Sequence, residues 1–266
     1  MALAEVSFFS QALRHNVKIQ AYIPTDRNML LQQESVYSCD KAKTLYLLHG
    51  IGGDCNDYIT YSNIIELAFN YNLAIIFPSG DVSFYLEDEE KEMDYSRFIG
   101  SELVAFTRAL FPLSQRKGDT FIGGLSMGGY GAVINGLRFS DVFSKIISMS
   151  GAFLTFDVAD FGRYLDDPLF SIRYRRSLFG SPVELRNSKK EPRYCIEMLR
   201  SEGKKIPQMY LTCGRDDFLL KENRTFHEYL LSSDIKHTYI ENEGMHNWDY
   251  WNRQLEPAIK WLLSDV

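Results

Sequence analysis

The sequence predicts an α/β protein: a mostly parallel central sheet with helices on both faces and an insertion between the sixth and seventh core strands. Short apolar runs alternate with segments of helical periodicity along the 266 residues, which is typical of such a sheet. One buried run ends in Gly124-Leu-Ser-Met-Gly128, and a helical segment follows at once. Another ends in the glycine-rich loop from His49 to Asp54. Both turns would lie at the carboxyl edge of the sheet.

Length and composition indicate a single domain spanning residues 1–266. Hydrophobic residues make up 45% of the chain and charged residues 24%, as in ordinary globular proteins. The net charge of −6 disfavours nucleic acid or an anionic membrane as the main partner. No apolar run is long enough for a membrane span. A small-molecule substrate is therefore the expected partner, and assembly into a homo-oligomer stays open.

Cysteine usage and the start of the chain favour a cytoplasmic protein. The four cysteines are widely spaced and form neither a C-x-x-C pair nor a metal-binding pattern: Cys39, Cys55, Cys195 and Cys213. Such thiols are ordinarily reduced in the cytosol. The first residues lack the basic region and the apolar stretch of a signal peptide.

Strands are predicted where apolar residues alternate or run continuously. The second strand alternates apolar residues from Val17 to Ile23, and later strands are continuous apolar runs that fit a buried parallel sheet. The predicted strands are residues 5–10, 17–23, 44–48, 73–77, 120–122, 144–148, 208–212 and 236–240. Helical spacing predicts helices over residues 57–70, 95–111, 129–138, 219–232 and 248–263. Residues 152–207 lack regular patterning, so we expect an irregular insertion near the active site rather than a second domain.

The sequence around Ser126 predicts a catalytic nucleophile. It fits G-x-S-x-G, with a strand before it and a helix after it, which is the context of a nucleophile elbow. Gly124 and Gly128 would let the strained turn close tightly beside the serine. The serine oxygen would then lie at a helix N-terminus, where the helix dipole favours developing negative charge. The alternative is a glycine-rich turn with an incidental serine.

A serine nucleophile needs a histidine base, and the five histidines can be compared by position. His15 and His49 precede the serine, whereas an α/β-hydrolase places its histidine last in the order Ser, Asp or Glu, His. His227 falls mid-helix and His237 begins a strand, which suits packed or surface roles. His246 lies in a loop between the last strand and the final helix, so we predict that it is the base.

The acid that orients the histidine should follow the penultimate strand. Two adjacent aspartates, Asp216 and Asp217, lie in the turn that follows the strand at residues 208–212. Neighbouring residues in a turn project differently, so only one can face His246. We predict that Asp217 is the acid, with Asp216 either capping the next helix or facing solvent.

Two backbone amides are predicted to form an oxyanion hole. One is Met127, directly after the nucleophile, and the other comes from the loop after the third strand, where Ile51 is preferred and Gly52 is the alternative. This loop lacks the spacing of a phosphate-binding loop. His49 within it is expected to be a packed structural residue.

The acidic run at residues 87–94 is the remaining candidate for a ligand site. It matches no calcium-binding loop, and a solvated charged surface is the commoner explanation. The proposed chemistry requires no metal and no cofactor.

Four motifs stand out in the sequence: Leu47-Leu-His-Gly50, Phe121-Ile-Gly-Gly-Leu-Ser-Met-Gly-Gly-Tyr-Gly-Ala132, Cys213-Gly-x-x-Asp217 and His246-x-Trp-x-Tyr-Trp251. Together they resemble the putative-esterase family, which contains esterase D (S-formylglutathione hydrolase) and the bacterial tributyrin esterases, the latter being more similar. The resemblance covers residues 43–263 and implies an α/β-hydrolase that cleaves short-chain acyl esters. It also implies Ser126, Asp217 and His246 as the triad, with Ile51 and Met127 as oxyanion donors. Arg215-Asp216 departs from the family pattern, and residues 152–207 match it poorly.

The expected function is a cytoplasmic serine carboxylesterase that works through an acyl-enzyme. Feruloyl esterase, carbohydrate acetyl esterase and S-formylglutathione hydrolase activities are the alternatives among enzymes. Mycolyl-type acyltransferases share the serine turn but act outside the cell. A hydrolase fold that only binds ligands is disfavoured because the whole set of catalytic residue types is present.

Overall fold

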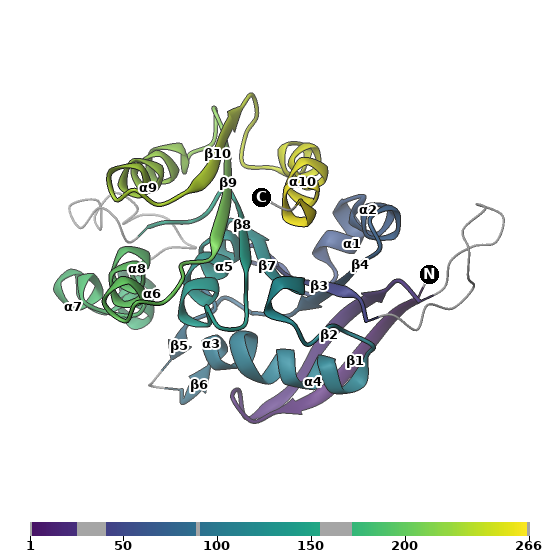
Figure 1. Ribbon diagram of the computed structural model, residues 1–266. Coiled ribbons are helices and arrows are strands. Elements are labelled where there is room, and N and C mark those ends of the chain that lie inside the picture. The colour runs from purple at the N-terminus through teal and green to yellow at the C-terminus, as the bar shows by residue number, and fades with distance from the viewer. Residues whose placement is uncertain (1, 26–40, 89–90, 155–171, 265–266) are drawn as a thin grey trace.

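The fold is built on one eight-stranded sheet, seen in a computed structural model that describes residues 2–25, 41–88, 91–154 and 172–264 (Figure 1). The strand order is β1-β2-β4-β3-β7-β8-β9-β10. Six neighbouring strands run parallel, whereas β1 and β2 join antiparallel at one edge. The strands are β1 (Ala2–Ser10), β2 (His15–Ile23), β3 (Lys43–Leu48), β4 (Leu73–Pro78), β7 (Thr120–Leu125), β8 (Lys145–Met149), β9 (Gln208–Gly214) and β10 (His237–Asn242). The predicted α/β architecture is confirmed.

Two apolar cores lie on opposite faces of the sheet because successive strand residues point to opposite sides. In β3, Leu45 and Leu47 join one core, while Tyr46 and Leu48 join the other. The first core is covered by α1 (Asp57–Tyr61), α2 (Ile64–Asn70) and α10 (Trp248–Leu263). The second is covered by α4 (Leu103–Leu110), α5 (Met127–Arg138), α8 (Pro192–Ser201) and α9 (Leu220–Ser232). The sheet is therefore buried on both sides, which explains its continuous apolar strands.

Two predicted helices are interrupted. The helix expected over residues 57–70 breaks at Ser62, whose hydroxyl donates to the Tyr58 carbonyl and accepts from the Ile64 amide. A serine that bonds the neighbouring backbone in this way competes with helix formation. The helix expected over residues 95–111 consists of α3 (Tyr95–Arg97), a π-helical turn (Phe98–Glu102) and α4.

The segment expected to be irregular contains helices joined by short loops in its described part. It carries α6 (Ile172–Phe179), α7 (Pro182–Arg186) and α8 between β8 and β9. A capping box begins α7: the Ser181 side chain accepts from the Glu184 amide, and the Glu184 carboxylate accepts from the Ser181 amide. Residues 155–171 of this segment lie outside the described residues.

The acidic run at residues 87–94 contributes a short hairpin, formed by β5 (Glu87–Asp88) and β6 (Met93–Asp94). Glu87 pairs with Arg138 at 2.6 Å, and the Asp94 side chain caps α3. The described carboxylates of the run are thus engaged in structural contacts, as in the ion pair of Asp88 with Lys91. A short 3-10 turn (Lys117–Asp119) leads into β7.

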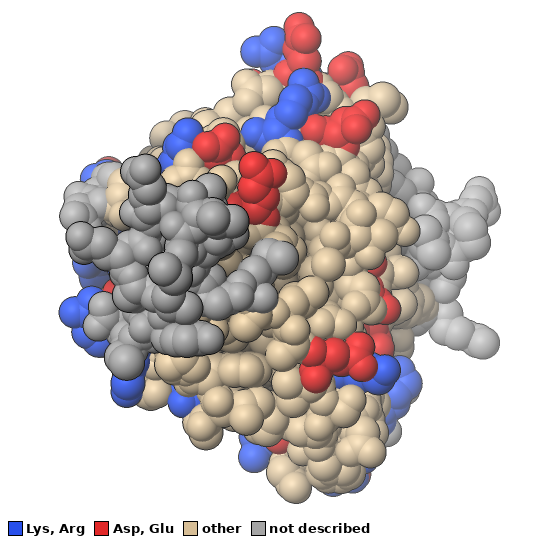
Figure 2. Space-filling view, turned by 90° about the vertical axis from the view of Figure 1, so that its right-hand side faces the viewer, with Lys and Arg blue, Asp and Glu red and all other residues tan. Residues whose placement is uncertain are grey.

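Surface charge is mixed on the face drawn in Figure 2. Acidic and basic side chains lie next to one another around a centre that is mostly uncharged, and the coloured residues of this face form no extended basic patch. Within the described ranges, every helix is too short or too polar to cross a lipid bilayer.

Candidate active site

Ser126 sits at the turn between β7 and α5 with a backbone that few residues adopt. Its φ of 55° lies in the left-handed region, and it occupies the N-cap position of α5. The Ser126 amide donates to the Met149 carbonyl, and the Ser126 carbonyl accepts from Tyr130 and Ala152. These bonds tie the strained turn to the end of β8, to the loop after it and to the first turn of α5, so that the side chain leaves the sheet at the start of the helix.

Close packing explains why the turn is flanked by glycines. A Cβ at Gly128 would lie 2.2 Å from the Leu48 carbonyl oxygen, and a Cβ at Gly124 would lie 2.4 Å from the Gly128 carbonyl oxygen. Both distances are to backbone, which cannot move aside easily. The sequence prediction that these two positions must be small is confirmed.

The structure brings Ser126, His246 and Asp217 together in one hydrogen-bonded line. The Ser126 Oγ lies 2.9 Å from His246 Nε2. His246 Nδ1 lies 2.9 Å from Asp217 Oδ2 and 3.1 Å from Oδ1. A carboxylate only accepts, so Nδ1 carries the proton and Nε2 is free to accept the serine proton. This is the tautomer that a general base for Ser126 needs.

The turn after β9 and the loop after β10 are held against each other. The Asp216 amide donates to the Gly244 carbonyl, and a Cβ at Gly214 would lie 2.2 Å from the Gly244 carbonyl oxygen. This close approach brings the Asp217 side chain, which is 5% exposed, next to the His246 ring. The Asp216 side chain is exposed, and the N-cap of α9 is Leu219, so Asp216 faces solvent rather than capping the helix.

Electrostatics keep the Asp217 carboxylate ionised. Burial alone would raise its pKa. Hydrogen bonds from His246, the Leu219 amide and the Ser150 hydroxyl, together with the charge of His246, lower the pKa by more than burial raises it, so the net pKa lies below the ordinary value. The Leu219 amide donates to Asp217 Oδ1 at 2.8 Å. An ionised carboxylate in this position both orients the imidazole and stabilises it once protonated.

His49 holds the loop after β3. Its Nε2 accepts from the Gly80 amide at 2.8 Å, so its Nδ1 carries the proton and donates to the Gly50 carbonyl at 2.7 Å. Burial lowers the pKa of His49, which favours the neutral ring. The Tyr85 hydroxyl donates to the His49 carbonyl at 3.0 Å. His49 is thus packed, and it also sets the orientation of the Gly50 carbonyl.

That orientation determines where the next amide points. The carbonyl and the N–H of a trans peptide face opposite sides, so the Ile51 N–H is directed away from the His49 ring. In the described part of the chain, neither the Ile51 nor the Met127 amide donates to a protein acceptor. Met127 is the first residue of α5, where amides lack helical partners. Gly52, the alternative donor, is exposed with a φ of 77°, and within the described residues its amide likewise donates to no protein acceptor.

The other histidines form hydrogen bonds with groups outside the line of Ser126, His246 and Asp217. His227 on α9 and His237 on β10 hydrogen-bond each other through their rings, and His227 stacks on Tyr239. The His15 ring bonds the Asn16 carbonyl at the β1–β2 turn. Of the five histidines, only His246 contacts the Ser126 side chain.

Ser150 and Trp251 adjoin the site but were not identified from the sequence as site residues. Trp251 packs edge-on against the His246 ring, with centroids 5.0 Å apart, and its indole N–H donates to Ser150 Oγ. The sequence does hint at Ser150, because it directly follows the strand next to the nucleophile strand. Its partners, however, lie on segments distant in sequence.

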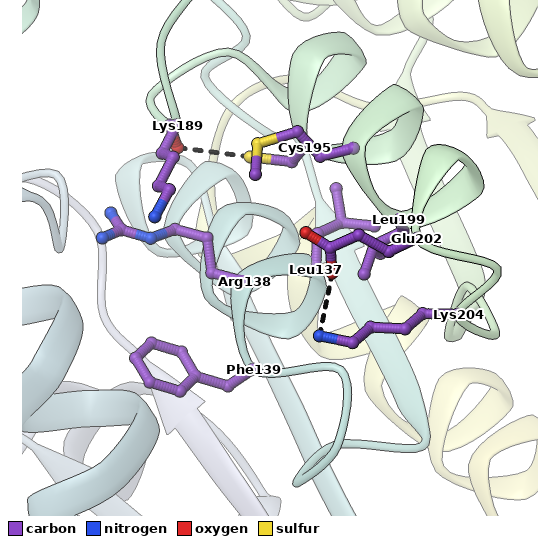
Figure 3. A pocket seen from close by; sticks show the side chains of 9 residues that line it. Leu137, Arg138, Phe139, Lys189, Cys195, Leu199, Glu202 and Lys204 are labelled. Atoms are coloured by element: carbon purple, nitrogen blue, oxygen red, sulfur yellow. Dashed lines mark hydrogen bonds and ion pairs between the residues drawn. The ribbon is translucent and has the colours of Figure 1, made fainter.

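A separate hollow of about 280 Å³ lies between α5 and α8 (Figure 3). Its lining includes Arg138, Cys195 and Lys204. The Cys195 thiol is buried, which raises its pKa to about 12. Arg138 ends α5, whereas Ser126 precedes its first residue. Twelve helical residues span about 18 Å, so this hollow is remote from the serine.

Comparison with known sequences identifies the family. Residues 10–262 match the profile of the family described as "Putative esterase". The chain is 41% identical over 262 residues to an acetyl esterase of Caldicellulosiruptor saccharolyticus, and the match covers 98% of both chains.

Known structures agree with this result. The structure of FphF, a fluorophosphonate-binding serine hydrolase of Staphylococcus aureus, superposes with a TM-score of 0.84 at 28% identity, covering 99% of both chains. An S-formylglutathione hydrolase (FrmB) from the same organism superposes with a TM-score of 0.83 at 27% identity, covering 99% of this chain and 100% of the other. The chain therefore belongs to the putative-esterase family and is a carboxylic ester hydrolase with the α/β-hydrolase fold.

Proposed function

We propose that the protein is a serine carboxylesterase that cleaves small, short-chain acyl esters with Ser126, His246 and Asp217 as its catalytic residues. The observation that carries this proposal is the continuous line of hydrogen bonds from Ser126 Oγ through His246 to Asp217. Each atom in the line has the donor or acceptor character that acyl transfer requires.

In the proposed acylation step, Ser126 Oγ attacks the ester carbonyl while His246 Nε2 takes the hydroxyl proton. Asp217 stabilises the imidazolium that forms. The Ile51 and Met127 amides donate to the oxyanion, and as unpaired amides they need no rearrangement before they bind it. Collapse of the tetrahedral intermediate expels the alcohol, which receives the proton from His246.

Deacylation uses the same groups with water in place of the serine. His246 Nε2 removes a proton from water, and the resulting hydroxide equivalent attacks the acyl carbonyl on Ser126. The acid is released, and the proton returns to Ser126 Oγ. All steps can be accomplished by groups of this chain and water.

The preference for short acyl groups is proposed from similarity. The resemblance to tributyrin esterases and the 41% identity to an acetyl esterase both support it. The structural likeness to FrmB supports a thioester of glutathione as a second candidate substrate. We further propose a cytoplasmic location, since Cys55, Cys195 and Cys213 are buried free thiols.

The decisive test of the nucleophile is Ser126→Ala. We expect kcat to fall by a factor on the order of 10⁴ or more, because removing one triad member disables the set. A fluorophosphonate probe should label the unaltered protein at Ser126 and leave the variant unlabelled. Ser101→Ala, at an exposed serine, is the matched control and should label and turn over normally. Activity of Ser126→Ala near that of the unaltered protein would refute the proposal.

A panel of nitrophenyl esters of rising acyl length tests the substrate class. We expect kcat/KM to be greatest between acetyl and butyryl and to fall for octanoyl. Feruloyl esters, acetylated sugars and S-formylglutathione belong in the same panel as competitors. A kcat/KM that keeps rising past octanoyl would exclude the short-chain proposal, and a clear preference for S-formylglutathione would select the thioester.

A further inference from the structure

Phe218 is an exposed aromatic side chain in the turn that carries Asp217. Exposure alternates along this turn, from 5% at Asp217 to 58% at Phe218 and 2% at Leu219. The amides of Leu219 and Leu220 donate to the side chain and the carbonyl of Asp217. The backbone that buries the carboxylate therefore also turns Phe218 outward. A single exposed apolar side chain is common on a protein surface, so what distinguishes this one is its position.

The Phe218 ring lies against the His246 imidazole. Their centroids are 4.6 Å apart, and the two planes are inclined at 49°. In the described part of the chain, the other aromatic ring against this imidazole is that of Trp251, with centroids 5.0 Å apart. Trp251 is only 6% exposed, which leaves little of it for a substrate to contact. Phe218 is therefore the accessible aromatic surface beside His246.

The proposed mechanism brings the leaving alcohol to this surface. Ester cleavage requires His246 Nε2, which lies 2.9 Å from Ser126 Oγ, to give its proton to the alcohol oxygen. The alcohol must then lie within hydrogen-bonding reach of Nε2 as the ester bond breaks. The imidazole is a small ring, so an alcohol at Nε2 is also close to the Phe218 ring. The acyl group, which stays on the serine, is under no such requirement.

We propose that Phe218 is a specificity-determining residue that contacts the leaving alcohol and favours alcohols carrying an apolar ring, such as a benzyl group. This inference rests on the proposed roles of Ser126 and His246. Contact with such a ring removes apolar surface of Phe218 from water, and two aromatic rings gain further from offset or edge-to-face packing. Ethanol has too little surface for either effect. Phe218 should thus raise kcat/KM for esters of ring-bearing alcohols and leave the acyl preference unchanged.

Paired acetate esters measure this preference. Benzyl acetate and ethyl acetate share their acyl group and both release primary alcohols, so they differ mainly in the group that would meet Phe218. We expect Phe218→Ala to lower kcat/KM for benzyl acetate about three- to tenfold, as for loss of one aromatic pair, and to change the value for ethyl acetate less than about twofold. Phe218→Leu keeps an apolar side chain, so its loss on benzyl acetate should be smaller.

Phe9→Ala is the matched control. Phe9 has a similar exposure of 53%, but it belongs to β1, at the edge of the sheet opposite β10. Its replacement should leave kcat/KM unchanged for both esters. Melting temperatures show whether each variant is folded. Equal losses on both esters in folded Phe218→Ala would mean that the ring only supports His246, and would overturn the alcohol site.

Acyl transfer to an added alcohol gives a second readout. An alcohol in the leaving-group site can attack the acyl-enzyme in place of water. His246 Nε2 takes the hydroxyl proton, the alcohol oxygen bonds the acyl carbon, and the bond to Ser126 Oγ breaks as that oxygen receives the proton. With ethyl acetate as donor and benzyl alcohol as acceptor, the ratio of benzyl acetate to acetic acid should be several-fold lower in Phe218→Ala.

This product ratio is set after the acyl-enzyme has formed, so slow acylation alone does not change it. A weakened His246 would slow attack by water and by benzyl alcohol alike, and would leave the ratio unchanged. An unchanged ratio in Phe218→Ala, or no benzyl acetate from the unaltered protein at high benzyl alcohol, would contradict an alcohol site at Phe218.

Failure of this inference is distinguishable from failure of the proposed function. If Ser126→Ala is inactive while folded Phe218→Ala keeps the normal ratio of kcat/KM between benzyl acetate and ethyl acetate, the alcohol site is refuted and the esterase stands. If Phe218→Ala instead alters the ratio between ethyl acetate and ethyl butyrate, the ring acts on the acyl side, which also refutes it. Full activity of Ser126→Ala would remove the function on which the inference rests.

Discussion

At the scale of single residues, the two neighbouring aspartates have the same side chain but differ in burial and in hydrogen bonding. Asp217 is buried and accepts hydrogen bonds from His246 and from a backbone amide, whereas Asp216 is exposed to solvent. A one-residue shift along the turn therefore decides whether a carboxylate can orient the imidazole. Each aspartate serves as the matched control for the other.

Replacing Asp217 by Asn should lower kcat by roughly 10³–10⁴, because the amide would favour the wrong imidazole tautomer; a comparable loss is known for the same change in a serine protease triad. Asp216→Asn should lower kcat by less than about tenfold, since its side chain faces water. Steady-state kinetics on one short nitrophenyl ester measures both. A crippled Asp216→Asn with an active Asp217→Asn would reverse the assignment of the acid.

Residue types and chain order selected the same three side chains that the structure brings into contact. Ser126 is marked by its glycines, and His246 by its place after the last strand. The hydrogen bonds of His49 could not be foreseen, because its partner Gly80 is 31 residues away and donates only its backbone amide. Any residue but proline could have supplied that amide, so the pairing leaves no trace in the sequence.

At the scale of elements, the junction of β7 and α5 depends on close contact with β3. We expect Gly128→Ala to destabilise the protein by about 2 kcal/mol or more, because its Cβ would overlap the Leu48 carbonyl oxygen. Activity should fall as well, since the turn carries Ser126. Gly118→Ala is the matched control: an added Cβ there has no heavy atom within 4 Å. Urea unfolding of both variants measures the difference, and equal midpoints would contradict this account.

The apolar periodicity of the sequence did not predict the interruptions of the two helices. Both interrupted helices keep their apolar spacing across the break, so the pattern alone predicts one continuous helix. The π-helical turn packs against a residue distant in sequence, because a Cβ at Gly100 would overlap the Phe139 ring. By contrast, α7 carried a local signal in Ser181-Pro-Val-Glu184, whose capping-box spacing predicts a helix start.

At the scale of the whole molecule, the alternation of strands and helices predicted a mostly parallel sheet, and the structure confirms it. The order of strands was not predicted. β4 lies between β2 and β3 in space although it follows both in sequence. Periodicity reports which residues are buried but not which strands are neighbours, because every central strand is apolar on both faces.

The strand order places the catalytic candidates on strands that differ in distance from the edge of the sheet. Ser126 follows a central strand, but His246 follows β10, which lies at the edge of the sheet and, among the described strands, pairs only with β9. An edge strand is secured by one ladder and can detach in a local opening that leaves the central strands folded. Such an opening would withdraw the base from the serine while most of the molecule stayed intact. Hydrolytic activity should therefore depend on this one edge of the sheet remaining paired. It should be lost before the whole protein unfolds.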